Sequence, residues 1–165
     1  MLRTIAALLL FAMPAHADIL VTFDEGAPKD RFTILNADRC PLDDASVTID
    51  LSGSAGKLIF DVTGTGAGIE VFQPFEAVTG ASALSSLPRV RDGDSAVTLA
   101  IHRLAPGDRI AFTIDVDDTT SGYGIMVSGS EIDGATVQID KGSSAAGNRF
   151  GPDATARVPF SSCLS

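Results

Sequence analysis

Short segments in which apolar and polar residues alternate recur along almost the whole chain. The clearest is 46–51, where Val47, Ile49 and Leu51 share one face and polar residues take the other. A period of two residues is typical of a strand with one buried face. Further segments of this kind are 19–23, 31–35, 58–62, 69–72, 96–101, 109–114, 124–128, 135–139 and 156–160.

Turn-forming residues separate these segments, and no long window beyond the first 17 residues places apolar residues at a helical period. Many short strands spaced by about ten residues are typical of a sandwich rather than of βαβ units. We therefore predict an all-β fold, a single β-sandwich or jelly-roll-like domain of about nine or ten strands. The least regular stretch is 74–94, where we expect one short helical turn near 81–87.

The N-terminus has the three parts of an export signal. Arg3 provides a basic start, residues 5–13 form an apolar run, and Ala15-His16-Ala17 follows Pro14 as a small-x-small cleavage pattern. The apolar run is too short to cross a membrane, which takes roughly 20 residues. We predict a signal peptide at 1–17, one domain at 18–165 and a periplasmic or extracellular location.

The charge and the cysteines fit an exported protein. The chain has 12 Lys and Arg against 21 Asp and Glu, a net charge of −9, which disfavours nucleic acid and anionic membranes as partners. The sequence has no second long apolar run, so it predicts no membrane span. Cys40 and Cys163 are the two cysteines, and in an oxidising compartment we expect them to form a structural disulfide; metal-bound or free thiols are the alternative.

Few residues are suited to catalysis. His102 is the one histidine after the predicted cleavage point, and we expect it to be exposed or on an edge strand. There is no G-x-S-x-G motif, and Gly64, Gly66 and Gly68 lack the helix and spacing of a dinucleotide site, which favours a loop or bulge. We predict that the protein is not an enzyme.

Acidic turns are the candidates for a specific site. Alternation places Asp115 and Asp117 on one face, Asp118 enters the following turn, and Glu131 lies in another acidic turn. Carboxylates at strand ends are the oxygen ligands that Ca²⁺ prefers, so we predict a calcium site at these four residues. Asp24-Glu25 is a further candidate. The alternative is that these carboxylates cap turns and keep sheet edges soluble.

The sequence has one feature for and one against a function on carbohydrates. Paired carboxylates can serve a glycosidase, with Asp115, Asp117 or Glu131 as acid and base. However, the chain has no Trp and Tyr123 is its one Tyr, so aromatic platforms for stacking on sugars are scarce. The phenylalanines with a core-like pattern are Phe32, Phe60, Phe72, Phe75 and Phe112.

Six stretches of the chain carry a family resemblance: 23–32, 58–64, 68–75, 104–110, 112–119 and 127–135. They resemble a group of small exported proteins of alphaproteobacterial type that are labelled aggregation factor core proteins. The resemblance implies secretion and calcium-dependent adhesion, and carries over no catalytic or ligand-binding residue. The leading hypothesis is thus a non-enzymatic exported β-sandwich for adhesion or surface association, assisted by calcium, with a surface polysaccharide or protein as partner. A glycan-binding module and, below it, a carboxylate-based hydrolase are the alternatives.

Overall fold

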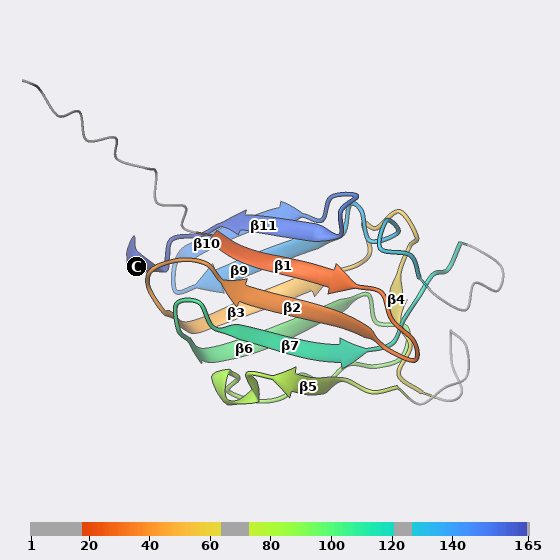
Figure 1. Cartoon of the computed structure of the whole chain (residues 1–165), viewed down its shortest axis with the longest axis horizontal. Helices are drawn as coiled ribbons and strands as arrows, with labels where there is room; N and C mark the ends of the chain where they lie inside the picture. Colours follow the sequence, from red (N-terminus) through yellow and green to blue (C-terminus); the bar gives the residue numbers. More distant parts are fainter. Residues whose placement is uncertain (1–17, 64–72, 121–126, 165) are drawn as a thin grey trace, which may run out of the picture.

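Two antiparallel sheets packed face to face make up the fold, as the computed structural model shows for residues 18–63, 73–120 and 127–164 (Figure 1). One sheet has five strands in the order β11-β1-β2-β7-β5, the other has four in the order β10-β9-β3-β6, and β4 and β8 form a small separate pair. The prediction of an all-β sandwich is therefore confirmed. The eleven described strands are β1 (Asp18–Asp24), β2 (Asp30–Asn36), β3 (Leu42–Asp50), β4 (Ile59–Phe60), β5 (Glu76–Thr79), β6 (Ala96–Leu104), β7 (Arg109–Ile114), β8 (Val116–Asp117), β9 (Thr136–Lys141), β10 (Ser144–Arg149) and β11 (Thr155–Pro159).

The alternating apolar residues of both sheets face each other and form one hydrophobic core. Phe32 on β2 lies at its centre, with its ring 5.2 Å from that of Phe112 and 5.0 Å from that of Phe23. Phe60 is also fully buried and Phe75 partly so, as predicted. Burial of these rings and of the β-branched residues opposite them is the main stabilising contribution.

The two ends of the chain meet in this fold. β1 pairs with β2 on one side and with the last strand, β11, on the other, so that Asp18 lies opposite Pro159. The predicted disulfide is confirmed, because Cys40 and Cys163 are joined with their Cα atoms 5.3 Å apart. Beside it the carboxylate of Asp38 accepts hydrogen bonds from the amide and hydroxyl of Ser162, both at 2.9 Å. The C-terminal tail is therefore held by covalent and polar contacts together.

Some strand boundaries differ from the prediction. The strand predicted at 46–51 begins earlier, since residues 42–45 also belong to β3, and the strand predicted at 58–62 is reduced to β4. The short helical turn is confirmed as the 3₁₀ turn η1 (Ala81–Ala83). The pattern did not predict β5 or β10, because most of their side chains are exposed and no alternation marks them. Several predictions fall outside the described residues: the signal peptide, the strand at 69–72, Tyr123 and the glycines at 64–68. Of the strand predicted at 124–128, only Val127 and Ser128 are described, and neither belongs to a strand.

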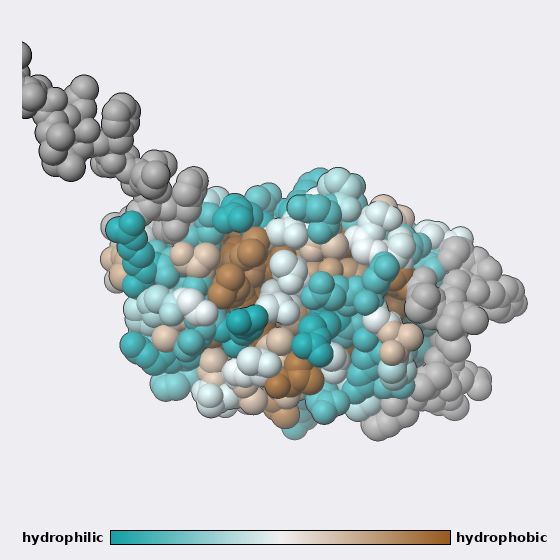
Figure 2. Space-filling model, in the orientation of Figure 1, coloured by the Kyte–Doolittle hydropathy of each residue, from teal (hydrophilic) through white to brown (hydrophobic). Residues whose placement is uncertain are grey.

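The outer face of the five-stranded sheet is largely hydrophilic, with hydrophobic residues gathered over β1 and β2 (Figure 2). Leu20 and Leu35 are cross-strand neighbours there and both are partly exposed. The described residues include no apolar helix of the length that a membrane crossing requires.

Candidate functional site

β1 and β7 terminate at the same end of the sandwich (Figure 1), and several acidic residues lie at or beside the strand ends there. Asp30 begins β2, Asp115 follows β7, Asp117 ends β8 and Asp61 follows β4. Their negative charges interact, since Asp115 and Asp117 both raise the pKa of Asp30 and of Asp61. Sequence positions far apart therefore meet in one region of strongly negative potential.

Asp61 is the most unusual member of this group. The residue is 1% exposed, and neither carboxylate oxygen accepts a hydrogen bond from the described residues. The carboxyl group of Asp92 lies within hydrogen-bonding reach, but two carboxylates are both acceptors and can share a hydrogen bond only when one of them is protonated. Burial, and then the neighbouring Asp92, raise the pKa of Asp61 to about 7.

Asp30 differs from Asp61 because its carboxylate has backbone donors. One oxygen accepts from the amide of Gly26 at 3.0 Å and the other from the amide of Val116 at 3.1 Å, which links β2 to β8. Burial nevertheless raises the pKa of Asp30 to about 7, against the effect of these two bonds. Burial and the charge of Asp117 raise the pKa of Asp115 to about 6.

The four residues predicted as calcium ligands make different contacts. Asp115 and Asp117 belong to the acidic group around Asp61. The carboxylate of Asp118 accepts from the amide of Thr120, and that of Glu131 accepts from the amide of Ser128, so both cap their own turns. Within the part of the chain that the structure describes, no three or more His, Cys, Asp or Glu side chains are arranged to hold a metal ion.

A calcium site of all four residues, like the acid–base pair of a hydrolase, therefore remains a prediction. Of the other acidic pair, Glu25 accepts from the amide of Gly129 and so also stabilises a turn. Asp61 and Asp92 were not among the predicted ligands. The signal for Asp61 is its position between Phe60 and Val62 in an otherwise apolar segment, where a charged residue is costly to bury.

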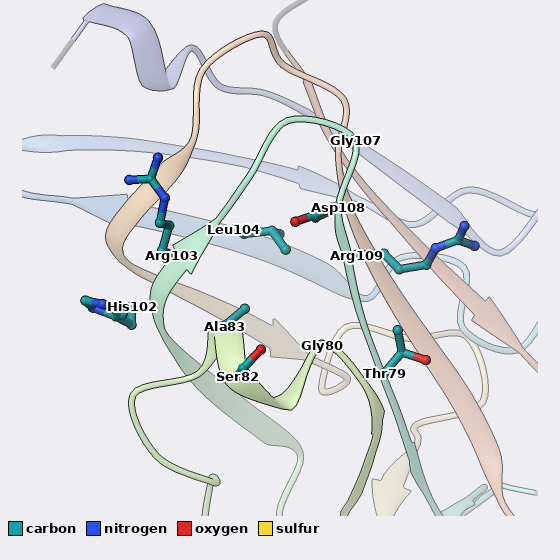
Figure 3. A pocket seen from close by; sticks show the side chains of 10 residues that line it. All are labelled: Thr79, Gly80, Ser82, Ala83, His102, Arg103, Leu104, Gly107, Asp108 and Arg109. Atoms are coloured by element: carbon teal, nitrogen blue, oxygen red, sulfur yellow. The ribbon is translucent and has the colours of Figure 1, made fainter.

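The opposite end of the sandwich carries a pocket of about 510 Å³, shown in Figure 3. It lies between η1 with the end of β5, the end of β6 and the β6–β7 turn. The apolar residues Ala83 and Leu104 line its centre, and the side chains of Ser82 and Asp108 point toward this space. The guanidinium group of Arg103 points away (Figure 3) and binds the carboxylate of Asp43 on β3 at 3.1 Å.

The backbone of Asp108 is fixed by hydrogen bonds, whereas its side chain can bind a ligand. Its amide donates to the carbonyl of Ala105 and its carbonyl accepts from the amide of Asn36. Gly107, with φ of 78°, allows the tight turn, since this backbone conformation disfavours other residues. Among the described residues the Asp108 carboxylate has no hydrogen-bond or ion-pair partner, so it presents an acceptor to the pocket. His102, which also lines the pocket, is on the edge strand β6 with a 71% exposed side chain, as predicted.

Asn36 supports this end of the molecule from inside. Its fully buried side-chain amide donates to the carbonyls of Cys40 and Leu104, both at 2.9 Å, and its side-chain oxygen accepts from the amide of Asp38. We expect Asn36→Ala to lower the free energy of unfolding by about 2–3 kcal/mol, because the Leu104 carbonyl and the Asp38 amide each lose a buried partner. The Cys40 carbonyl still accepts from the hydroxyl of Ser162 at 3.0 Å. Urea unfolding measures this loss of stability, with the exposed Asp140→Ala as control; equal stability of the two variants would contradict the assigned role of Asn36.

The described residues define a two-sheet antiparallel β-sandwich with a disulfide between its C-terminal tail and an early loop. A disulfide of this kind is typical of proteins in oxidising compartments. No protein-family model matches the chain, and neither does any curated protein.

Two solved structures from Clostridium thermocellum are similar in general architecture. One is the carbohydrate-binding module CBM3b of the cellulosomal cellobiohydrolase 9A, which is 13% identical over 78% of this chain and 93% of that chain, with a TM-score of 0.40. The other is a biomass-sensing module of RsgI-like proteins, described as resembling a family 3 carbohydrate-binding module, with 11% identity over 88% and 97% of the two chains and a TM-score of 0.34.

Proposed function

We propose that this protein is a non-catalytic, exported β-sandwich that associates with a surface by binding a polysaccharide in the pocket between η1 and the β6–β7 turn. The observation that carries the proposal is the Asp108 carboxylate, which has no partner among the described residues and points toward the same space as Ser82 (Figure 3). The resemblance to aggregation factor core proteins also supports a role in adhesion to a surface.

The pocket offers the groups that a sugar ring requires. Sugar hydroxyls donate and accept, so a carboxylate and a hydroxyl can bind adjacent positions on one ring. The C–H face of a sugar can pack on the apolar surface of Ala83 and Leu104. The cavity of about 510 Å³ lies in the range of small-molecule sites, which is about 300–1,000 Å³, and would hold one or two sugar units of a longer chain.

A site of this kind predicts weak binding to each sugar unit. No Trp occurs in the chain, and the described residues that line the pocket include no Phe or Tyr, so stacking on a large aromatic ring does not contribute there. Hydrogen bonds to an exposed site contribute modestly, since water competes for the same groups. Adhesion would then depend on many copies engaging one repetitive polymer, where effective concentration multiplies weak contacts.

The test is binding of the chain from Asp18 onward to an array of bacterial and plant polysaccharides, followed by variants. We expect Asp108→Ala and Ser82→Ala each to weaken polysaccharide binding about 10-fold or more, because each removes hydrogen bonds to the hydroxyls of the bound sugar. Both positions lie at the surface turn or in η1, so the melting temperature should change little.

Asp140→Ala removes an exposed carboxylate from β9, away from the pocket, and serves as the matched control. It should bind like the unmodified chain. An array without any binder, or a polysaccharide that binds both pocket variants as tightly as the control, would refute the proposal.

A further inference from the structure

A buried carboxylate that lacks a donor must be neutralised in some way. Transferring an ionised carboxylate into the protein interior costs several kcal/mol even after relaxation, unless an opposite charge or donors compensate. Asp61 is 1% exposed and has neither kind of compensation among the described residues. The charged groups that act on it, Asp92, Asp115 and Asp117, are all acidic.

Lys29, a basic group that acts on this acidic end, is already engaged. Lys29, which acts on the charge of Asp115, donates to the carbonyl of Pro74 at 3.0 Å and to the carboxylate of Glu76 at 3.3 Å. Its ammonium group therefore binds at the edge strand β5, and no cation of the described residues pairs with Asp61. No cation of the described residues is among the groups that act on Asp61, so a bound ion or a bound proton is left to supply the positive charge.

We propose that a divalent cation of the calcium type binds between the carboxylates of Asp61 and Asp92. Oxygen ligands alone, supplied by two carboxylates with carbonyl and water oxygens, are the donor set that calcium accepts. Asp115 and Asp117 act at longer range, because their charges make the region more negative without having to contact the ion. This assignment differs from the four acidic residues that the sequence pointed to and does not depend on the proposed polysaccharide, which binds at the other end.

Both carboxylate-bearing segments are fixed before any ion arrives. The amide of Val62 donates to Asp92 Oδ1 at 3.2 Å, and the amide of Asp61 donates to the carbonyl of Asp115 at 3.1 Å. Phe60 exchanges backbone hydrogen bonds with the turn that carries Asp92, since its amide donates to the carbonyl of Asp94 and its carbonyl accepts from the amide of Gly93. Because the backbone around both carboxylates is already ordered, binding of an ion costs little conformational entropy.

The experiment is calorimetric titration of the chain from Asp18 onward with CaCl2 at pH 7.5, together with thermal melts in EDTA and in CaCl2. We expect measurable heat and a rise in melting temperature of about 5 °C or more at saturating calcium, because the ion binds the folded chain alone. In ¹⁵N spectra the amides of Val62 and Gly93 should shift, whereas amides around Asp108 should not.

Asp61→Asn is the decisive variant, because its amide can donate to Asp92 and the chain should fold without the ion. It should lose the calcium heat and melt at the same temperature in EDTA and CaCl2, while Asp140→Asn responds like the unmodified chain. Absence of heat and of a melting shift in the unmodified chain would overturn the proposal and leave a shared proton between the two carboxyls. Retention of the full calcium response by Asp61→Asn would overturn it equally. Neither outcome affects polysaccharide binding, which is measured separately in EDTA.

Discussion

Loss of the Cys40–Cys163 disulfide is expected to lower the free energy of unfolding by about 4–5 kcal/mol and the melting temperature by about 10–20 °C. The bond joins residues 123 positions apart, so it closes nearly the whole folded chain into one loop. In the chain-entropy account such a long loop restricts the unfolded ensemble strongly, and the stabilisation grows with the logarithm of its length.

The measurement compares urea unfolding of the oxidised chain with that of the double variant Cys40→Ser and Cys163→Ser. Neighbouring contacts should partly survive in the variant, because Asp38 binds the amide and hydroxyl of Ser162 without the sulfur bridge. Asp38→Asn in the oxidised chain separates the two contributions and should cost less than the loss of the disulfide. A double variant as stable as the oxidised chain would contradict the expectation.

The second large effect is a loss of stability as the pH rises from about 4.5 to 7.5. Three carboxyl groups at the acidic end have raised pKa values in the folded state, about 7 for Asp30 and Asp61 and about 6 for Asp115, in each case mainly because of burial. The groups facing them are Asp92, Asp117 and Lys29, of which only Lys29 is positive.

The sign follows from proton uptake. In the unfolded chain an aspartate loses its proton near pH 4, whereas the folded chain keeps these protons up to pH 6–7. Between these values the folded state binds more protons, so stability falls with rising pH by up to about 1.4 kcal/mol per pH unit for each proton of difference.

Asp38 acts in the opposite direction. Burial alone would raise its pKa, but hydrogen bonds from Ser162 and from backbone amides outweigh that effect and lower it. Its contribution is therefore present above the unfolded pKa and is lost as the pH falls through the folded value. We expect maximum stability in calcium-free buffer near pH 4–5, between the two opposing effects.

Urea midpoints at pH 4.5, 6.0 and 7.5 in EDTA test this expectation. General repulsion within an acidic chain also grows with pH, but added salt screens it, whereas the buried groups respond little to salt. Asp30→Asn and Asp61→Asn should flatten the profile and Asp140→Asn should not. A midpoint that is highest at pH 7.5 in the unmodified chain would contradict the prediction.

The alternation of residue types predicted the central strands well. Ile19, Val21 and Phe23, like Val47 and Ile49, all face the core, because a strand of a sandwich has one buried face and therefore a period of two. β10 has no such period, since it is an edge strand whose residues are mostly exposed, and β5 also lies at a sheet edge. β6 and β11 are edge strands too, but alternate residues of theirs are buried, so their sequences show the period that β5 and β10 lack.

The candidate sites were less accessible to sequence reasoning. Asp115 and Asp117 could be assigned to one face of a strand end, which is a local property. The neighbourhood of Asp61 and Asp92 depends on the backbone exchange between Phe60 and the turn at 91–94, and the pocket depends on η1 meeting a turn 25 residues later. Such contacts between distant segments leave no period or spacing in the chain.

The pairing of β1 with β11 also determines when this protein can become folded. A chain that emerges N-terminus first, from a ribosome or a translocation channel, has its first strand bonded on one side at most until the last strand has appeared. Cys40 likewise waits for Cys163, and with only two cysteines no other intramolecular pairing can trap the chain meanwhile. Completion of the five-stranded sheet and closure of the disulfide therefore both require nearly the whole described chain, from β1 to Cys163.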